Sequence, residues 1–312
     1  MNLQQLDYIV AVDNYRHFST AAEKCFVTQP TLSMMIHKLE DELDVKIFDR
    51  SKQPVVPTEI GRAIIEQARL ILNETARLRE IVSTQKETVE GELRIAIIPT
   101  LAPYLMPLFV KKMAERYPSV KLYISEMTTE NIINKLKLSA LDVGIMATPT
   151  NDKDLFENFL FFEEFVAYAS QNEAILSKRY LLANDIDVNR LVLLEEGHCM
   201  RSQVINLCEL RHASSRISNV FYEAGSIETL KNMIEVLSGV TILPELAISN
   251  MDEEQLQSVR FFKSPAPVRE ISLVTHRAFV KKRLIDILKT EIMDNLPERF
   301  KKNKPFNRID IS

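Results

Sequence analysis

Between two unlike halves of this chain lies a long helical pattern, and it constrains the fold more than any other feature of the sequence. From residue 64 to residue 82, apolar or small residues recur alternately four and three positions apart, which is the spacing of a coiled-coil seam. These positions are Ile64, Ala68, Ile71, Thr75, Leu78 and Val82. Capped by Thr58, a helix over 58–90 would extend about 45 Å. We therefore expect a linker helix that separates two folded units and pairs with a second copy; packing on its own domain is the alternative.

The first 57 residues have the pattern of short helices joined by a tight turn. Helical spacing of apolar residues runs through LQQLDYIVAVDNY, FSTAAEKC and QPTLSMMIHKLEDELD. Pro30 stands in the first turn of the third segment, where its missing N–H would have no partner anyway. This order predicts a helix-turn-helix followed by a small wing, KIFDRSKQPVVPT. The residues expected to face DNA are Gln29, Pro30, Thr31, Ser33, Met34, His37, Lys38, Arg50 and Lys52.

The charge of this N-terminal unit gives DNA binding no general support. Its first 62 residues carry seven Lys or Arg against nine Asp or Glu, a net charge of −2, and the whole chain carries −4. A single module with that balance would hold phosphates poorly. The pattern alone therefore leaves open a three-helix cluster with no DNA role. Several modules bound together would gain effective concentration and offset the weak charge.

From residue 91 onward the pattern changes to short β-rich runs separated by helical stretches. The β-rich runs are ELRIAIIPT, KLYISEM, LDVGIMA, EFVAYAS, LVLLEEG, ISNVFYEAG, GVTILPE and EISLVTHR. Such alternation predicts an α/β unit of parallel strands with crossover helices. Ligands in these sheets lie beyond the carboxyl ends of strands, here at 98–100 and 195–199. The basic tail RFKKNKPFNR is expected to be mobile.

Length and composition narrow the class of protein further. A chain of 312 residues is long enough for two or three units. Its N-terminus lacks the pattern of a secretory signal, and no apolar run approaches the roughly 20 residues of a membrane span. We expect a cytoplasmic protein with no membrane contact. Three cysteines in a reducing compartment do not form a disulfide scaffold, so a close pair is redox-active, metal-binding or buried.

The stretch FSTAAEKCFVTQPTLSMMIHKLEDELDVKIFDR, followed by VVPTEIG, resembles the signature of LysR-type transcriptional regulators. The order of segments is similar to that family over nearly the full chain. The resemblance implies a winged helix-turn-helix over 1–57, a dimerising linker helix over 58–90, and a two-lobed α/β effector domain similar to periplasmic binding proteins. Lobe I would take 91–162 and 269–312, and lobe II 163–268. The sequence departs from the usual pattern at Met34, Asp44 and Ile60, where a basic residue, a glycine and an alanine are common.

The family also implies partners. Its members bind double-stranded promoter DNA, act with RNA polymerase, and assemble as homodimers through the linker helix and further into homotetramers. We expect the same of this chain.

GHCMRSQVINLC, from Gly197 to Cys208, places two of the three cysteines nine positions apart. A strand ending at Leu194 and a helix starting near His198 would put Cys199 in the first helical turn. There the free N–H groups and the helix dipole favour a thiolate, and Arg201 and a protonated His198 would add to this.

The same stretch resembles the hydrogen peroxide-sensing members of the family, as do IPTLAPYLMP and SIETLKNMIEVLSGVTILPELA. By this resemblance Cys199 is the peroxidatic cysteine and Cys208 the resolving one, with glutaredoxin or thioredoxin as reductant. If the intervening residues were an unbroken helix, the two Cα atoms would lie about 13 Å apart. A disulfide needs roughly 4.4–6.8 Å, so the helix would have to unravel. Oxidation would then act as a conformational switch that controls antioxidant genes.

By the same resemblance, the peroxide pocket contains three further residues beside His198 and Arg201: Thr100, Thr129 and Arg269. Thr100 and Thr129 match hydroxyl donors that hold the peroxide, and Arg269 matches a cation that lowers the pKa of Cys199. Each has a structural alternative: Thr100 and Thr129 as helix caps, and Arg269 as a surface ion pair.

Other interpretations of the cysteines stay open. His198, Cys199, Cys208 and His212 offer four zinc-type ligands, although not at the spacing of compact zinc modules. The chain would otherwise be a LysR-type regulator that binds a small organic ligand in the interlobe cleft, with structural cysteines, or a thiol peroxidase. We expect no enzyme, no metal and no cofactor, and we interpret Cys25 as a small buried hydrophobe.

Overall fold

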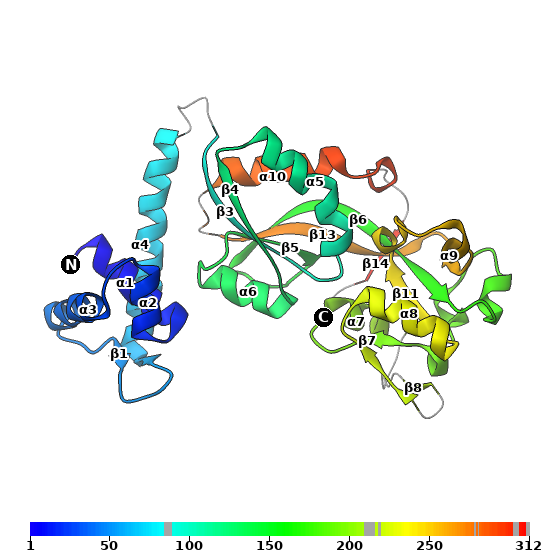
Figure 1. Ribbon diagram of the computed structural model, residues 1–312, viewed down its shortest axis with the longest axis horizontal. Coiled ribbons are helices and arrows are strands. Elements are labelled where there is room, and N and C mark those ends of the chain that lie inside the picture. The colour runs from blue at the N-terminus through cyan, green and yellow to red at the C-terminus, as the bar shows by residue number, and fades with distance from the viewer. Residues whose placement is uncertain are drawn as a thin grey trace. The chain divides into compact units, whose positions relative to one another are not determined.

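The computed structural model describes residues 1–83, 89–208, 216–217, 220–277, 279, 281–301 and 306–309. The chain divides into two compact units. The first consists mainly of Met1–Thr88, and the second of Val89–Lys137, Leu141–Arg277 and Leu284–Ser312. The element order along the chain can be followed by colour in Figure 1.

The first unit is a winged helix-turn-helix, as predicted. Its elements are α1 (Leu3–Tyr15), α2 (Phe18–Lys24), α3 (Gln29–Leu43) and the antiparallel strands β1 (Phe48–Asp49) and β2 (Val56–Pro57). Leu32, Ile36 and Leu39 lie on one face of α3 and are fully buried, because their three- and four-residue spacing turns them all toward α1 and α2. The opposite face of α3 is left for a partner.

Helix α3 ends at a residue with a left-handed backbone conformation, which is unusual for a residue other than glycine. Asp44 adopts φ 53° and ψ 40° at the C-cap. Only glycine enters this region without steric cost, and Asp and Asn tolerate it better than most residues. Asp44 therefore adopts a conformation that a glycine at this position would also adopt.

The linker helix α4 (Glu59–Ser83) begins where the pattern predicts. The Thr58 hydroxyl accepts a hydrogen bond from the Gly61 N–H at 3.0 Å. Glycine is required at 61, because a Cβ there would lie 2.0 Å from the Ile47 carbonyl oxygen. The helix ends at Ser83, and residues 84–88 of the expected 58–90 span lie outside the described residues.

The first turns of α4 pack on their own domain, whereas pairing of the later turns with a second copy stays a prediction. Ile65 and Ala68 are buried in the core of the first unit, and Ile64 and Ile71 pack against it, so the first turns serve their own domain. Leu78 by contrast keeps 66% of its surface exposed. A second copy would therefore pair with the later turns.

The second unit contains a mixed sheet with the strand order β11–β6–β13–β5–β3–β4, in which β12 also pairs with β6 and β14 with β13. The strands are β3 (Gly91–Ile97), β4 (Val120–Glu126), β5 (Val143–Thr148), β6 (Leu155–Ala169), β11 (Val240–Pro244), β12 (Val259–Phe261), β13 (Ala266–His276) and β14 (Phe306–Arg308). Strands β3, β4 and β5 are parallel, as expected. The expectation of parallel strands throughout is wrong, because β6, β11, β12 and β13 pair antiparallel.

Two long strands, β6 and β13, run through the whole unit. The first part of β6, up to Glu164, pairs with β13, and its last part, from Phe165, pairs with β11. The boundaries proposed for the two lobes, at 162/163 and 268/269, thus fall inside these strands. Residues on them can join groups from both ends of the unit.

Helices cover this sheet on both sides. Figure 1 shows α5 (Ala102–Arg116) and α10 (Lys282–Asn295) on one side of the β3–β4–β5 region and α6 (Thr129–Lys137) on the other. Two short strands, β7 (Leu193–Leu194) and β10 (Glu223–Ala224), pair in parallel. Helix α7 (Cys199–Leu207) contacts β7, and α8 (Ile227–Leu237) contacts both strands.

The expectation of a mobile C-terminal tail is wrong for residues 306–308. They form β14, which pairs in parallel with the start of β13. Residues 302–305 and 310–312 lie outside the described residues.

Candidate functional site

Cys199 occupies the first turn of α7, as the sequence predicts. The helix starts directly after a loop in which Gly197 has φ +95°, a conformation that disfavours any other residue. His198 is the N-cap but gives no side-chain cap. The first N–H groups of α7 therefore stay available, and those of Cys199 and Met200 lower the pKa of the Cys199 thiol.

The balance of effects on Cys199 corrects the expectation of a favoured thiolate. Burial raises the pKa of the thiol above its ordinary value, while the positive charge of Arg269, the Thr129 hydroxyl and the backbone N–H groups lower it. Burial is the largest of these effects, so the pKa of the thiol is raised overall. In this packing most Cys199 is therefore a neutral thiol at neutral pH.

Arg269 is the centre of a buried polar network. Its Nε donates to the Glu163 Oε2 at 2.8 Å, and its Nη1 donates to the Thr100 hydroxyl at 2.9 Å. Both Arg269 and Glu163 are fully buried, so the alternative of a surface ion pair is wrong. Glu163 also accepts a hydrogen bond from the Leu246 N–H at 2.8 Å. Glu163 was not predicted from the sequence, although a carboxylate inside the apolar run FFEEFVAYA was a signal.

The two threonines do not act as helix caps. Thr100 precedes Leu101, the N-cap of α5, and its hydroxyl accepts from Arg269, so the hydroxyl proton is left to donate. Thr129 is the first residue within α6, and its buried hydroxyl has no nitrogen or oxygen partner among the described residues. The Thr129 hydroxyl nevertheless lowers the pKa of the Cys199 thiol. These hydroxyls therefore provide unused donor capacity near Cys199 and Arg269.

His198 and Arg201 do not play the electrostatic role that was predicted. Burial lowers the pKa of His198, and the carboxylate of Glu195, 3.9 Å from its Nε2, opposes this only in part, so the imidazole is neutral at neutral pH. Arg201 is engaged with other groups: its Nη1 donates to the Leu194 carbonyl at 2.7 Å and its Nη2 lies 2.8 Å from Glu223. A residue two positions along a helix faces a different side, which accounts for the error.

Cys208 is the C-cap of α7, at the far end of the helix that Cys199 begins. It is half-buried, and burial raises its pKa to about 11. Both cysteines are free thiols. Along an unbroken helix their Cα atoms lie about 13 Å apart, too far for a disulfide.

The exposed face of α3 is the candidate DNA interface. Thr28 caps the helix and Pro30 follows in its first turn. Ser33 is half-buried, and the other members of the predicted α3 set are exposed: Gln29, Pro30, Thr31, Met34, His37 and Lys38. The most apolar of them, Met34, has 62% of its surface exposed.

The two basic residues of the wing differ in how many contacts hold their side chains. Arg50 donates to the Ser33 hydroxyl at 3.0 Å, lies 3.4 Å from Glu40, and stacks over the Phe18 ring at 4.7 Å. It therefore ties the wing to α3. Lys52 is exposed, with Asp49 at 3.8 Å. Glu40 is buried and also accepts a hydrogen bond from the Ile47 N–H at 2.8 Å. Its part in joining the wing to α3 was not predicted from the sequence.

Neither metal ligands nor a membrane span is evident in the parts of the chain that the structure describes. No group of three or more His, Cys, Asp or Glu side chains is placed to hold a metal ion there. His212, one of the four zinc-type ligands considered, lies outside those parts. No described helix combines the length and the apolar character that crossing a bilayer requires.

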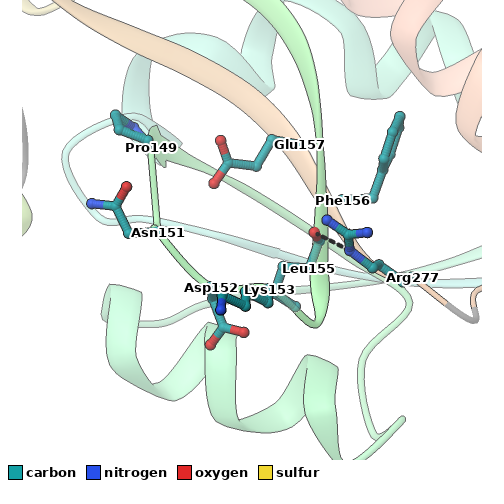
Figure 2. A pocket seen from close by; sticks show the side chains of 8 residues that line it. All are labelled: Pro149, Asn151, Asp152, Lys153, Leu155, Phe156, Glu157 and Arg277. Carbon is teal, nitrogen blue, oxygen red and sulfur yellow. Dashed lines mark hydrogen bonds between the residues drawn. The ribbon is translucent and has the colours of Figure 1, made fainter.

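A separate surface pocket of about 340 Å³ lies where β6 begins, and Figure 2 shows its lining. Its main charged groups are already paired. Glu157 accepts from the Thr150 N–H and hydroxyl at 2.7 Å, Arg277 donates to the Leu155 carbonyl at 3.3 Å, and Asp152 lies 2.6 Å from Lys137. We assign this pocket no ligand.

Comparison with known proteins identifies the class of this protein. Residues 3–62 match the family described as bacterial regulatory helix-turn-helix protein, lysR family, and residues 86–292 match the LysR substrate binding domain. The chain therefore belongs to the LysR family of DNA-binding transcription regulators.

Within the family, the chain is similar to proteins named for hydrogen peroxide. It is 35% identical over 276 residues to the "Hydrogen peroxide-inducible genes activator" of Haemophilus influenzae, covering 88% of this chain and 90% of that protein. A full-length OxyR variant from Pseudomonas aeruginosa superposes with a TM-score of 0.79 at 33% identity, over 94% of this chain and 98% of that one. A peroxide-bound OxyR mutant from Corynebacterium glutamicum gives a TM-score of 0.61 at 26% identity, over 94% and 92%. The resemblance to the peroxide-sensing subgroup is thus confirmed.

Proposed function

We propose that this chain is a transcription regulator that senses hydrogen peroxide by oxidation of Cys199 and formation of a Cys199–Cys208 disulfide, and thereby switches antioxidant genes. One observation carries the proposal. Cys199 starts α7 under the influence of Arg269 and Thr129, and Cys208 ends the same helix, both as free thiols. The names of the related proteins supply the nature of the signal.

The chemistry proceeds in two balanced steps. The Cys199 thiolate attacks one peroxide oxygen, the O–O bond breaks, and the departing hydroxide takes a proton to become water, leaving a sulfenic acid. Donors from Thr100, Thr129 and Arg269 stabilise the departing oxygen. The Cys208 thiolate then attacks the Cys199 sulfur, the S–O bond breaks, and a second water leaves. Two electrons pass from the thiols to the peroxide, and a cellular dithiol such as glutaredoxin or thioredoxin returns them.

The second step converts oxidation into a change of fold. Cα atoms about 13 Å apart must approach to roughly 4.4–6.8 Å, so α7 has to unwind. The Cys208 N–H then leaves the Val204 carbonyl, to which it donates at 3.0 Å. A covalent bond that fits only one of two packings shifts the equilibrium between them. The new packing alters contacts between subunits and hence the spacing of their DNA-binding units.

In this proposal the first unit binds DNA and pairs the subunits. The exposed face of α3 enters the major groove, with Lys38 and Lys52 on phosphates and Gln29, Thr31 and Met34 at base edges. Copies pair through the later turns of α4, around Leu78, and two pairs form a homotetramer that acts with RNA polymerase on promoter DNA in the cytoplasm. A thiol peroxidase with slow turnover would need neither the helix-turn-helix nor the pairing helix α4.

A footprint on the protein's own promoter, with and without an equivalent of hydrogen peroxide, tests the function. We expect an altered footprint with the wild-type protein and none with Cys199→Ser. Cys25→Ser is the matched control, because Cys25 lies in the other unit, and it should behave as wild type. A footprint that peroxide leaves unchanged would reject peroxide sensing and favour a regulator whose effector is a small organic ligand.

A further inference from the structure

The C-terminal segment returns to the strand that carries Arg269. Strand β14 pairs in parallel with the first residues of β13, with Phe306 opposite Ala266 and Arg308 opposite Val268. This pairing fills the edge of β13 just before β5 takes it over at Glu270. The tail therefore pairs with β13 only up to Val268, the residue before Arg269.

Side chains anchor the tail at this place. The Phe306 ring stacks on Phe162, with centroids 4.0 Å apart, and Phe162 in turn lies 4.8 Å from Phe159. Arg308 lies 3.2 Å from the Glu270 carboxylate. An aromatic contact and an ion pair in addition to strand pairing indicate a specific docking of the tail.

Ile309 joins β13 to the helix that carries the cysteines. Its N–H donates to the Val268 carbonyl at 2.8 Å, and its carbonyl accepts from the Gln203 Nε2 at 3.1 Å. Gln203 lies in α7 between Cys199 and Cys208, and it is fully buried. Its Oε1 is buried without a partner among the described residues. Among the described residues, the bond from its Nε2 to Ile309 is therefore the hydrogen bond that holds this side chain.

We propose that residues 306–309 form a latch on the redox helix, and that Gln203 is the positioning residue through which the latch acts. The proposal rests on the proposed function. The disulfide requires α7 to unwind, and Gln203 lies in the segment that must move, so its bond to Ile309 has to break. Breaking it removes the hydrogen bond of the Gln203 Nε2, and the loss of this bond favours the intact helix. The latch thus slows disulfide formation after Cys199 has reacted and sets how much peroxide is needed to switch the protein.

The latch acts on the second oxidation step and not on the first. Arg269 contacts Thr100 and Glu163, and neither contact involves the tail. Removing the latch should therefore leave the rate of sulfenic acid formation unchanged while the disulfide forms faster. A general loosening of the fold would change both steps, so this difference separates positioning from a merely structural role.

Rapid-quench thiol trapping on three full-length proteins and two shortened chains tests the proposal. The variants are Gln203→Met, a chain that stops after Lys301, and Gln257→Met as control, since Gln257 is exposed and undergoes the same chemical change. We expect disulfide formation about three- to tenfold faster in the first two, the range that one net hydrogen bond gives. The control should match wild type. Combining Gln203→Met with the shortened chain should add nothing, because both changes remove the same bond.

Hydrogen exchange of the reduced proteins tests the latch independently of the redox chemistry. Amides of Met200–Leu207 should exchange faster in the shortened chain and in Gln203→Met than in wild type. Unchanged exchange in α7, or disulfide formation at the wild-type rate in both variants, would overturn the latch. Failure of the wild-type protein to form a disulfide, with faster α7 exchange in the variants, would overturn the proposed function and leave the contact between tail and helix standing.

Discussion

Replacing Arg269 by methionine and Glu163 by glutamine should change the reactivity of Cys199 in opposite directions. The positive charge of Arg269 lowers the pKa of the Cys199 thiol, and Glu163 offsets part of that charge through a bond of 2.8 Å. Methionine keeps most of the volume of arginine without the charge, and glutamine keeps the shape of glutamate. We expect Arg269→Met to raise the pKa of Cys199 further and Glu163→Gln to lower it.

The size of the effect follows from the coupling of the two charges. Adding or removing a close charge shifts a pKa by about 1–3 units, and we take about one unit because the pair already cancels in part. Since the pKa of Cys199 lies above neutrality, one unit changes the thiolate fraction about tenfold at pH 7. A less basic thiolate is also less nucleophilic, with a Brønsted coefficient of about 0.4–0.5, so the peroxide rate changes about three- to fourfold per unit.

Folding stability supplies the control for these variants. Each single substitution leaves one fully buried charge without its partner, which costs about 3–5 kcal/mol. The double variant removes both charges and should recover most of this loss. Rates are therefore compared at a temperature where thermal melts show all four proteins to be folded.

The assay is the pH dependence of Cys199 alkylation, followed by mass spectrometry in a background of Cys25→Ser and Cys208→Ser. The midpoint should move up in Arg269→Met and down in Glu163→Gln relative to the parent. Two midpoints that move in the same direction, or that do not move, would refute the electrostatic role of the pair.

Three further substitutions test the dimer seam, the burial of Cys208 and the DNA interface. Leu78→Lys, at an exposed position of α4, should split the homotetramer into smaller species in sedimentation equilibrium; a persistent tetramer would contradict the seam. Burial raises the pKa of Cys208 from 9.0 to about 11, so the unfolded chain loses that proton first, and the free energy of unfolding of the reduced protein should fall as pH rises from 9 to 11. Cys208→Ser should show a smaller fall, because Cys199, whose pKa is raised too, still contributes, and an identical pH profile would refute the burial. Lys38→Ala, on the exposed face of α3, should make the salt dependence of DNA affinity shallower by about 0.9 for each phosphate that the lysine neutralises; an unchanged slope would remove Lys38 from the interface.

Local patterns in the sequence predicted much of the fold. The position of α7 was predictable, because Gly197 after a β-rich run marks a helix start, and so were the winged helix-turn-helix and the cap at Thr58. Each depends on neighbours within a few residues. The antiparallel course of β6 and β13 was not predictable, because their pairing joins residues about a hundred positions apart and leaves no local signature.

The electrostatics of the site depended on such distant partners. Arg201 is only two positions from Cys199 in sequence, yet it pairs with Glu223 on β10, whereas Arg269 comes from a distant strand and acts on the thiol. Glu163, which weakens that action, is 106 residues from Arg269. Proximity in sequence therefore selected the wrong cation, and only the resemblance to a known family pointed to Arg269.

Peptide mapping of the whole chain after one equivalent of hydrogen peroxide is the most direct test of the proposed redox switch. We expect a single new cross-linked pair containing Cys199 and Cys208, reversed by a dithiol and absent from both Cys199→Ser and Cys208→Ser, while Cys25 stays alkylatable. Persistence of both thiols, or a bridge that involves Cys25, would contradict the switch.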